Sequence, residues 1–497
     1  MRTEPPTHQD PTHQPAANDP TPTDPAATDA APTDATPAGG TPTGPTGRSG
    51  GGGTWSALRP LVLRLHFYAG LLIAPFLLVA AVSGLLYALS FQAEKIVYRH
   101  ELEVPVGDSV LPLAEQVDSA RRAHPDATVT AVWPSAGAGA TTRVLMASPE
   151  VEDGKSLAVF VDPYTAQVRG TLPGYGSSGA LPLRTWLAEL HRDLHLGEPG
   201  RLYSELAASW MWVVALGGLL LWLGRKRATR RALFLPEGGP RSRRRTLSWH
   251  GSVGLWASAG LLGLSATGLT WSTYAGENIA SVRERLGGAT PTISATLGGG
   301  AAAGGEAHEG HGTHHDPAAP AGDGTDIGID RAVEAAREVG VDGRIAVTPP
   351  TDGKGYVVKE TDTQYPVRLD ATAIDPATGE VLDTLRFADY PLLAKLTRFG
   401  IDAHTGVFLG LANQLALAAL ALALILLVVW GYRMWWLRRP GRPVAPGTWR
   451  RVPAPLLLPL AAGTALVGWF VPLLGLSLLA FLAVDVTRSA VSRRRAA

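Results

Sequence analysis

The chain has 497 residues, of which 45% are hydrophobic, and its formal net charge is +1. A charge this close to zero argues against nucleic acid as the main partner. The sequence has no cysteine, which excludes disulfides, zinc–thiolate sites, iron–sulfur clusters and thiolate ligation of haem. Histidine is therefore the best available ligand for a redox metal.

The first segment, residues 1–54, consists almost entirely of Pro, Thr, Ala, Asp and Gly. Such a segment buries too little apolar surface to offset its ordering entropy, so we predict a disordered tail. It also lacks the apolar stretch of a signal peptide, which leaves targeting to the first apolar helix.

Long apolar runs follow, and they approach the length that crosses a bilayer. We predict single spans at 61–90, 206–224, 250–274 and 406–432, and a two-helix hairpin at 454–487. The total is six spans, so the lipid bilayer is the first predicted partner.

Basic residues gather in the loops 225–248 and 433–453 and in the tail 488–497. Short loops rich in Lys and Arg stay on the cytoplasmic side, so we predict a multi-pass protein of the cytoplasmic membrane with both termini inside. Residues 91–205 and 275–405 are then extracytoplasmic.

Each extracytoplasmic region has the pattern of a small α+β domain. The first predicts a helix at 113–124 and the second a helix at 329–339, and each helix precedes short β-rich runs. An Asp-Pro turn signal closes both sets, at Asp162-Pro163 and Asp375-Pro376. The predicted fold class is an α-helical integral membrane protein with a duplicated helix–domain–helix unit and a C-terminal helical hairpin. The predicted strands are 128–132, 142–147 and 157–161 in the first domain, and 344–348, 355–359 and 367–374 in the second.

Histidine phrases recur in both halves of the chain. Leu65-His66-Phe67 and Trp249-His250-Gly251 begin two apolar runs, and eighteen residues after each histidine comes Gly84 or Gly268. Asp193-Leu194-His195-Leu196-Gly197 and Asp402-Ala403-His404-Thr405-Gly406 precede two other runs.

With these phrases and the two Asp-Pro turns, residues 58–440 resemble the PepSY-associated transmembrane family of bacterial membrane proteins. That family includes iron-regulated membrane proteins and ferric-siderophore reductases. The resemblance implies that the two extracytoplasmic domains are PepSY domains. It also implies haem b between the helices and electron transfer outward.

Two axial pairs follow from the predicted topology: His66 with His250 inside, and His195 with His404 outside, for one or two haem b groups. His191 is an alternative to His195, because Gly197 and the residues after it interrupt the helix. A strip of glycines beside the histidines suits a flat cofactor; close helix packing is the alternative explanation, and the two are compatible. Those glycines are Gly70, Gly84, Gly254 and Gly268.

Three further features of the sequence each have two interpretations. Asp193 and Asp402 either orient an imidazole or begin a helix, and Arg64 either reaches a haem propionate or extends to the headgroups. A Gly/Ala-rich insert at 301–325 is either a metal-binding tract or a bare linker. Its histidines are His308, His311, His314 and His315.

Our first functional hypothesis is a haem-dependent electron carrier, and so an enzyme that reduces extracytoplasmic ferric chelates for iron uptake. Its partners are a ferric siderophore or its carrier, and a quinol or another membrane electron donor, because the cytoplasmic loops are too short for a flavin or nicotinamide domain. The alternative is a non-enzymatic PepSY protein that regulates an extracellular peptidase or senses a ligand. A transporter is a third hypothesis, weakened by the absence of mid-span charges in the four main helices.

Overall fold

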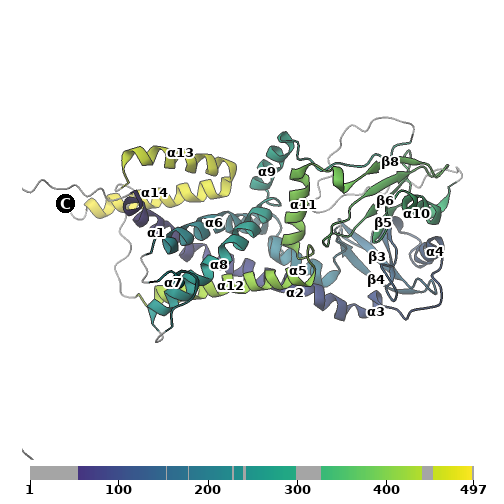
Figure 1. Ribbon diagram of the computed structural model, residues 1–497, viewed down its shortest axis with the longest axis horizontal. Helices are drawn as coiled ribbons and strands as arrows, with labels where there is room; N and C mark the ends of the chain where they lie inside the picture. Colours follow the sequence, from purple (N-terminus) through teal and green to yellow (C-terminus); the bar gives the residue numbers. More distant parts are fainter. Residues whose placement is uncertain are drawn as a thin grey trace, which may run out of the picture. The chain divides into compact units, whose positions relative to one another are not determined.

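The computed structural model describes most of the chain from Thr54 onward (Figure 1). The predicted N-terminal tail and the His-rich insert with His308, His311, His314 and His315 lie outside the described residues. The described ranges are 54–152, 154–176, 178–225, 229–238, 242–297, 326–438 and 452–494.

Five helices in these ranges are long and apolar enough to cross a membrane, so the chain is a multi-pass membrane protein. A sixth apolar helix, α13 (Ala454–Phe470), has 17 residues and is shorter than the other five. The prediction of six spans therefore holds for five of them by length. The five are α2 (Ala74–Val97), α6 (Glu198–Leu223), α8 (Arg243–Leu269), α12 (Leu411–Trp436) and α14 (Pro472–Arg494).

The structure divides the predicted first span, 61–90, between two helices. Helix α1 (Thr54–Leu72) ends one residue before Ile73, and α2 begins with Pro75 in its first turn. Proline has no backbone N–H and its ring clashes with the preceding turn, which breaks a helix at this point.

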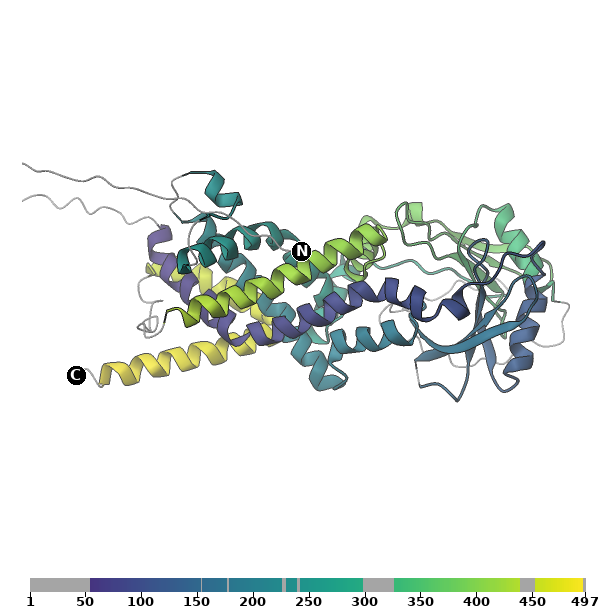
Figure 2. The ribbon, with the colours of Figure 1, turned by 90° about the horizontal axis from the view of Figure 1, so that it is seen from below.

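The spanning helices pack through small and branched side chains. Helix α6 packs against α1 and α8, and α12 packs against α2 and α8. Figure 2 shows the light-green α12 running alongside the purple α2. The C-terminal hairpin turns tightly, because a Cβ on Gly475 would lie 2.5 Å from the carbonyl oxygen of Gly468. Side chains buried in the bundle include Ala69, Leu77, Trp210, Leu261 and Leu424.

A short helix precedes each of two spans. Helix α5 (Pro182–Asp193) leads into α6, and α11 (Leu392–Thr405) leads into α12. Gly197 and Gly410 are the N-caps of the spans, with φ of 62° and 55°. Glycine adopts such positive φ values without steric cost, which permits the sharp change of direction at both places.

Two buried glutamates on the spanning helices accept hydrogen bonds from the first N–H groups of neighbouring helices. Glu94 of α2 accepts the backbone N–H groups of Leu181 and Arg184, and its other oxygen pairs with the Arg184 guanidinium at 2.9 Å. Glu205 of α6 accepts the N–H groups of Tyr274 and Ala275, each at 3.0 Å, at the start of α9 (Tyr274–Arg285). Carboxylates satisfy the unpaired N–H groups of a helix start and favour its positive dipole end.

The two predicted α+β domains share one antiparallel sheet of eight strands, in the order β4-β3-β2-β1-β5-β6-β7-β8. Strands β1 and β5 join the halves at the Val132–Val347 pair. The strands are β1 (Thr128–Trp133), β2 (Thr142–Ala147), β3 (Lys155–Val161), β4 (Val168–Tyr175), β5 (Ile345–Thr348), β6 (Tyr356–Glu360), β7 (Ala371–Ile374) and β8 (Val381–Leu385).

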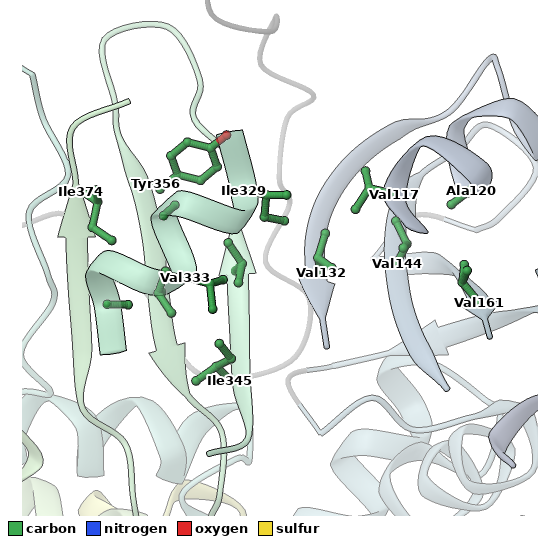
Figure 3. Packing of buried hydrophobic residues seen from close by; sticks show 14 of the residues in the cluster. Val117, Ala120, Val132, Val144, Val161, Ile329, Val333, Ile345, Tyr356 and Ile374 are labelled. Carbon is green, nitrogen blue, oxygen red and sulfur yellow. The ribbon is translucent and has the colours of Figure 1, made fainter. Parts of the chain in front are cut away.

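One hydrophobic core underlies both halves of the sheet (Figure 3). Helix α4 (Leu113–Ala123) places Val117 and Ala120 over the first four strands, and α10 (Gly328–Glu338) places Val333 over the others. Asp330 of α10 accepts the N–H groups of Leu113 and Ala114 at 2.7 and 3.0 Å, so each half helps to stabilise the other. The remaining elements are α3 (Arg99–Leu102), α7 (Arg231–Phe234) and the 3-10 turn η1 (Phe387–Asp389).

Candidate functional site

Two histidines, one on α1 and one on α8, face each other, and Figure 1 shows α1 at the end of the bundle away from the sheet. The ring centroids of His66, on α1, and His250, on α8, lie 6.4 Å apart and the ring planes meet at 72°. Nδ1 of His66 lies 2.9 Å from the carbonyl oxygen of Val214, and Nδ1 of His250 lies 3.1 Å from that of Leu427. A carbonyl oxygen only accepts, so each Nδ1 carries the proton and each Nε2 keeps its lone pair. We call these residues the sheet-distal pair.

A second pair lies nearer the sheet. The ring centroids of His191, on α5, and His404, on α11, are 6.5 Å apart with an interplanar angle of 56°. Nδ1 of His191 lies 2.9 Å from the Ser83 hydroxyl of α2, and Nδ1 of His404 lies 2.8 Å from the Thr267 hydroxyl of α8. We call His191 and His404 the sheet-proximal pair.

The Ser83 and Thr267 hydroxyl groups that contact the sheet-proximal pair donate their own protons to other acceptors. Ser83 donates to the carbonyl oxygen of Val79 and Thr267 to that of Gly263, both at 2.9 Å. Each hydroxyl oxygen therefore accepts from an imidazole, and the Nε2 lone pairs are free here too. Burial lowers the pKa of His404 to about 3 and also lowers that of His191, so both rings are neutral, which is the form that ligates metals.

A glycine lies against each of the four imidazoles. A Cβ added to Gly218 would lie 2.9 Å from Cε1 of His66, and one on Gly84 would lie 3.2 Å from Cε1 of His191. The corresponding distances are 3.3 Å from Gly268 to His404 and 4.0 Å from Gly431 to His250. Gly218, Gly84 and Gly268 let the rings approach the neighbouring helix closely enough to bond its carbonyl or hydroxyl groups, whereas a Cβ at Gly431 would make only an ordinary contact.

Two of the four predicted glycines, Gly84 and Gly268, therefore contact the sheet-proximal histidines. Gly70 has open space where a Cβ would stand, and Gly254 would meet only a Leu427 methyl, at 3.6 Å. Sequence reasoning missed Gly218 and Gly431. The signal for the first was present, because Gly217-Gly218 is the only adjacent glycine pair inside an apolar span of the first half.

The sequence predicts His195 as the partner of His404, with His191 as the alternative, and the structure brings His191 there. Helix α5 ends at Asp193, and Leu194 and His195 both adopt left-handed conformations with φ of 56° and 55°. His195 consequently turns outward, stacks on Trp186 at 4.9 Å and approaches Glu189 at 3.6 Å. Helix α11, in contrast, remains helical through Thr405 and keeps His404 inside.

The charged residues near the histidines make structural contacts. Arg64 forms a buried ion pair with Asp485 of α14, which differs from both interpretations of the sequence. Asp193 accepts the backbone N–H of His195 and pairs with Arg192, and Asp402 pairs with Arg398 at 2.6 Å.

Within the described part of the chain, no group of three or more His, Asp or Glu side chains is arranged to hold a metal ion. What the structure offers is two imidazole donors per site, each with its second nitrogen already bonded. Such a site suits a metal centre that brings its other ligands with it.

These features define a multi-pass helical membrane protein that carries an eight-stranded sheet and two facing histidine pairs within its helical part. The chain belongs to the PepSY-associated TM region family, whose model matches residues 63–438. Among curated proteins, none matches this sequence.

Proposed function

We propose that the chain holds two b-type haems, one in each histidine pair, and carries electrons across the membrane to ferric chelates on the sheet side. The spacing of the rings carries this proposal. Two imidazoles that would hold one metal between them, with metal–nitrogen bonds of about 2 Å, would have ring centroids roughly 6 Å apart. The two pairs measure 6.4 and 6.5 Å.

The donor set fits haem in two further respects. The porphyrin supplies four nitrogens, so the protein needs to supply only two axial ligands. The Nδ1 hydrogen bonds fix the tautomer that leaves Nε2 for iron, a common arrangement around ligating histidines.

Haem supplies one-electron redox chemistry when bound, and this chain's residues ligate it, fix its orientation and shield it. A quinol or another membrane donor delivers electrons on the side of the basic loops, which we assign to the cytoplasm of a cell with this protein in its cytoplasmic membrane. One electron converts one chelated ferric ion to ferrous iron. Ferrous iron binds the oxygen donors of siderophores less tightly, so the metal is released.

The experiment is a pyridine haemochrome assay on purified full-length protein made in cells supplied with iron and porphyrin precursor. We expect two haems per chain in the wild type and one in each of His66→Ala, His250→Ala, His191→Ala and His404→Ala. His195→Ala is the matched control and retains two, because that side chain is outside both pairs. A colourless wild-type protein refutes the proposal and favours the non-enzymatic PepSY alternative.

A further inference from the structure

The C-terminal hairpin, α13 and α14, lies beyond the residues that the family model matches. It is nevertheless attached to the bundle by polar contacts. Asp485 pairs with Arg64, the Ser477 hydroxyl accepts the indole N–H of Trp210 at 2.8 Å, and the Phe470 carbonyl accepts the Asn278 amide at 2.9 Å.

The contact from Asn278 reaches α9, and the other two reach the helices that hold His66. Arg64 and Tyr68 precede and follow His66 by two residues, and the Tyr68 ring lies 6.0 Å from that of Phe481 on α14. Trp210 lies one turn before Val214, whose carbonyl oxygen accepts the His66 Nδ1 proton. The hairpin therefore contacts both the helix that carries His66 and the helix that orients it.

The ion pair is the contact of this attachment whose disruption is most costly. The side chains of Arg64 and Asp485 are 8% and 6% exposed, and Asp485 lies within a candidate membrane span. Removing one partner of a buried ion pair leaves the other charge uncompensated in a medium that solvates it poorly. Without Asp485, the Arg64 guanidinium loses the carboxylate that holds it against α14, and His66 is two residues away on the same helix.

Helix α1 packs directly against α6, and Pro75 interrupts its continuity with α2, so the hairpin contact is an additional constraint on the position of α1. The sheet-proximal pair has no such constraint, since its rings are bonded to Ser83 of α2 and Thr267 of α8. Loss of the hairpin contact should consequently disturb one histidine pair and leave the other in place.

We propose that Asp485 is a positioning residue for His66, and that the α13–α14 hairpin holds α1 against α6 so that the sheet-distal pair can form. The haem test of this inference depends on the proposed function, whereas its cross-linking test does not.

The cross-linking test uses the absence of cysteine from the natural sequence. Tyr68→Cys and Phe481→Cys together create the only thiol pair, which a short thiol-reactive cross-linker joins in membranes. We expect efficient cross-linking in this background and at least a fivefold loss when Asp485→Asn is added. The matched control, Thr487→Ala, changes an exposed residue of α14 and keeps the yield. The charge-reversed double variant Arg64→Asp with Asp485→Arg restores it, which distinguishes lost pairing from misfolding.

The haem test compares Asp485→Asn with the histidine variants. We expect its haem content to fall from two per chain to one, with the remaining spectrum matching that of His66→Ala and not that of His404→Ala. Full cross-linking together with two retained haems in Asp485→Asn overturns the inference. Loss of both haems also overturns it, because the effect would not be selective. If the wild type binds no haem, the proposed function fails and the cross-linking yields alone decide the role of Asp485.

Discussion

Gly218 lies beneath the imidazole of His66, and its neighbour Gly217 provides an unusually close control. In Gly218→Ala the new Cβ would lie 2.9 Å from Cε1 of His66, a separation at which the ring must move. In Gly217→Ala the new Cβ would lie 3.4 Å from Cβ of His66, which is an ordinary contact. Both changes replace glycine by alanine on the same helix, one residue apart.

The expected energies differ because only one change disturbs a hydrogen bond. Alanine is favoured over glycine within a helix by about 1 kcal/mol, and this gain is common to both variants. Displacing His66 breaks its 2.9 Å bond to the Val214 carbonyl, and a buried polar group left unsatisfied costs about 1–3 kcal/mol. Gly218→Ala should therefore be less stable than Gly217→Ala by about 1–3 kcal/mol.

The assay is thermal unfolding of the two variants in the same detergent, followed by haem titration. We expect a lower unfolding midpoint for Gly218→Ala and a loss of about 10- to 100-fold in haem affinity at the sheet-distal pair, the usual effect of disturbing a ligand's own hydrogen bond. Gly217→Ala should match or exceed the wild type. Equal midpoints and equal affinities for the two variants contradict the role assigned to Gly218.

Three further changes test other contacts. Thr267→Val keeps the shape of the side chain but removes the acceptor of His404 Nδ1, so haem affinity should fall at the sheet-proximal pair alone, measured against His191→Ala. Glu205→Gln leaves one oxygen to accept two N–H groups at the start of α9; it should lower stability by about 1–3 kcal/mol, while the exposed Glu277→Gln should not. Asp330→Asn removes the charge that caps α4 and should destabilise the sheet domain by about 1 kcal/mol, measured by the urea midpoint of sheet-domain tryptophan fluorescence.

Much of the fold could be predicted because its elements carry strong local patterns. The predicted strand at 142–147 has the bounds of β2, and the predicted helix at 113–124 extends one residue beyond α4. Strands β4 and β8 were missed. The first contains Gly170, Pro173 and Gly174, residues that disfavour strands, and both lie at the edges of the sheet, where pairing with one neighbour imposes little pattern.

The sequence also could not predict that the two domains join into one sheet. Residues in β1 and β5 are more than 200 positions apart, and no local pattern reports a partner at that distance. The break in the first span could have been predicted, because Pro75 marks it. Hydropathy alone does not predict the break, since the apolar run continues through this position.

The exchange of His195 for His191 shows why matching phrases did not identify matching sites. Counted from the shared aspartates Asp193 and Asp402, His195 corresponds to His404, and His191 corresponds to Gly400. A Cβ on Gly400 would lie 3.0 Å from the methyl group of Thr267, whereas the residue in the equivalent place on α2, Ser83, has no methyl group. A histidine two residues before the aspartate, such as His191, therefore fits beside serine. A histidine two residues after the aspartate, such as His404, fits beside threonine, provided that the short helix continues that far. The two halves thus use different positions of a similar phrase, and the choice depends on one methyl group and on where a short helix ends.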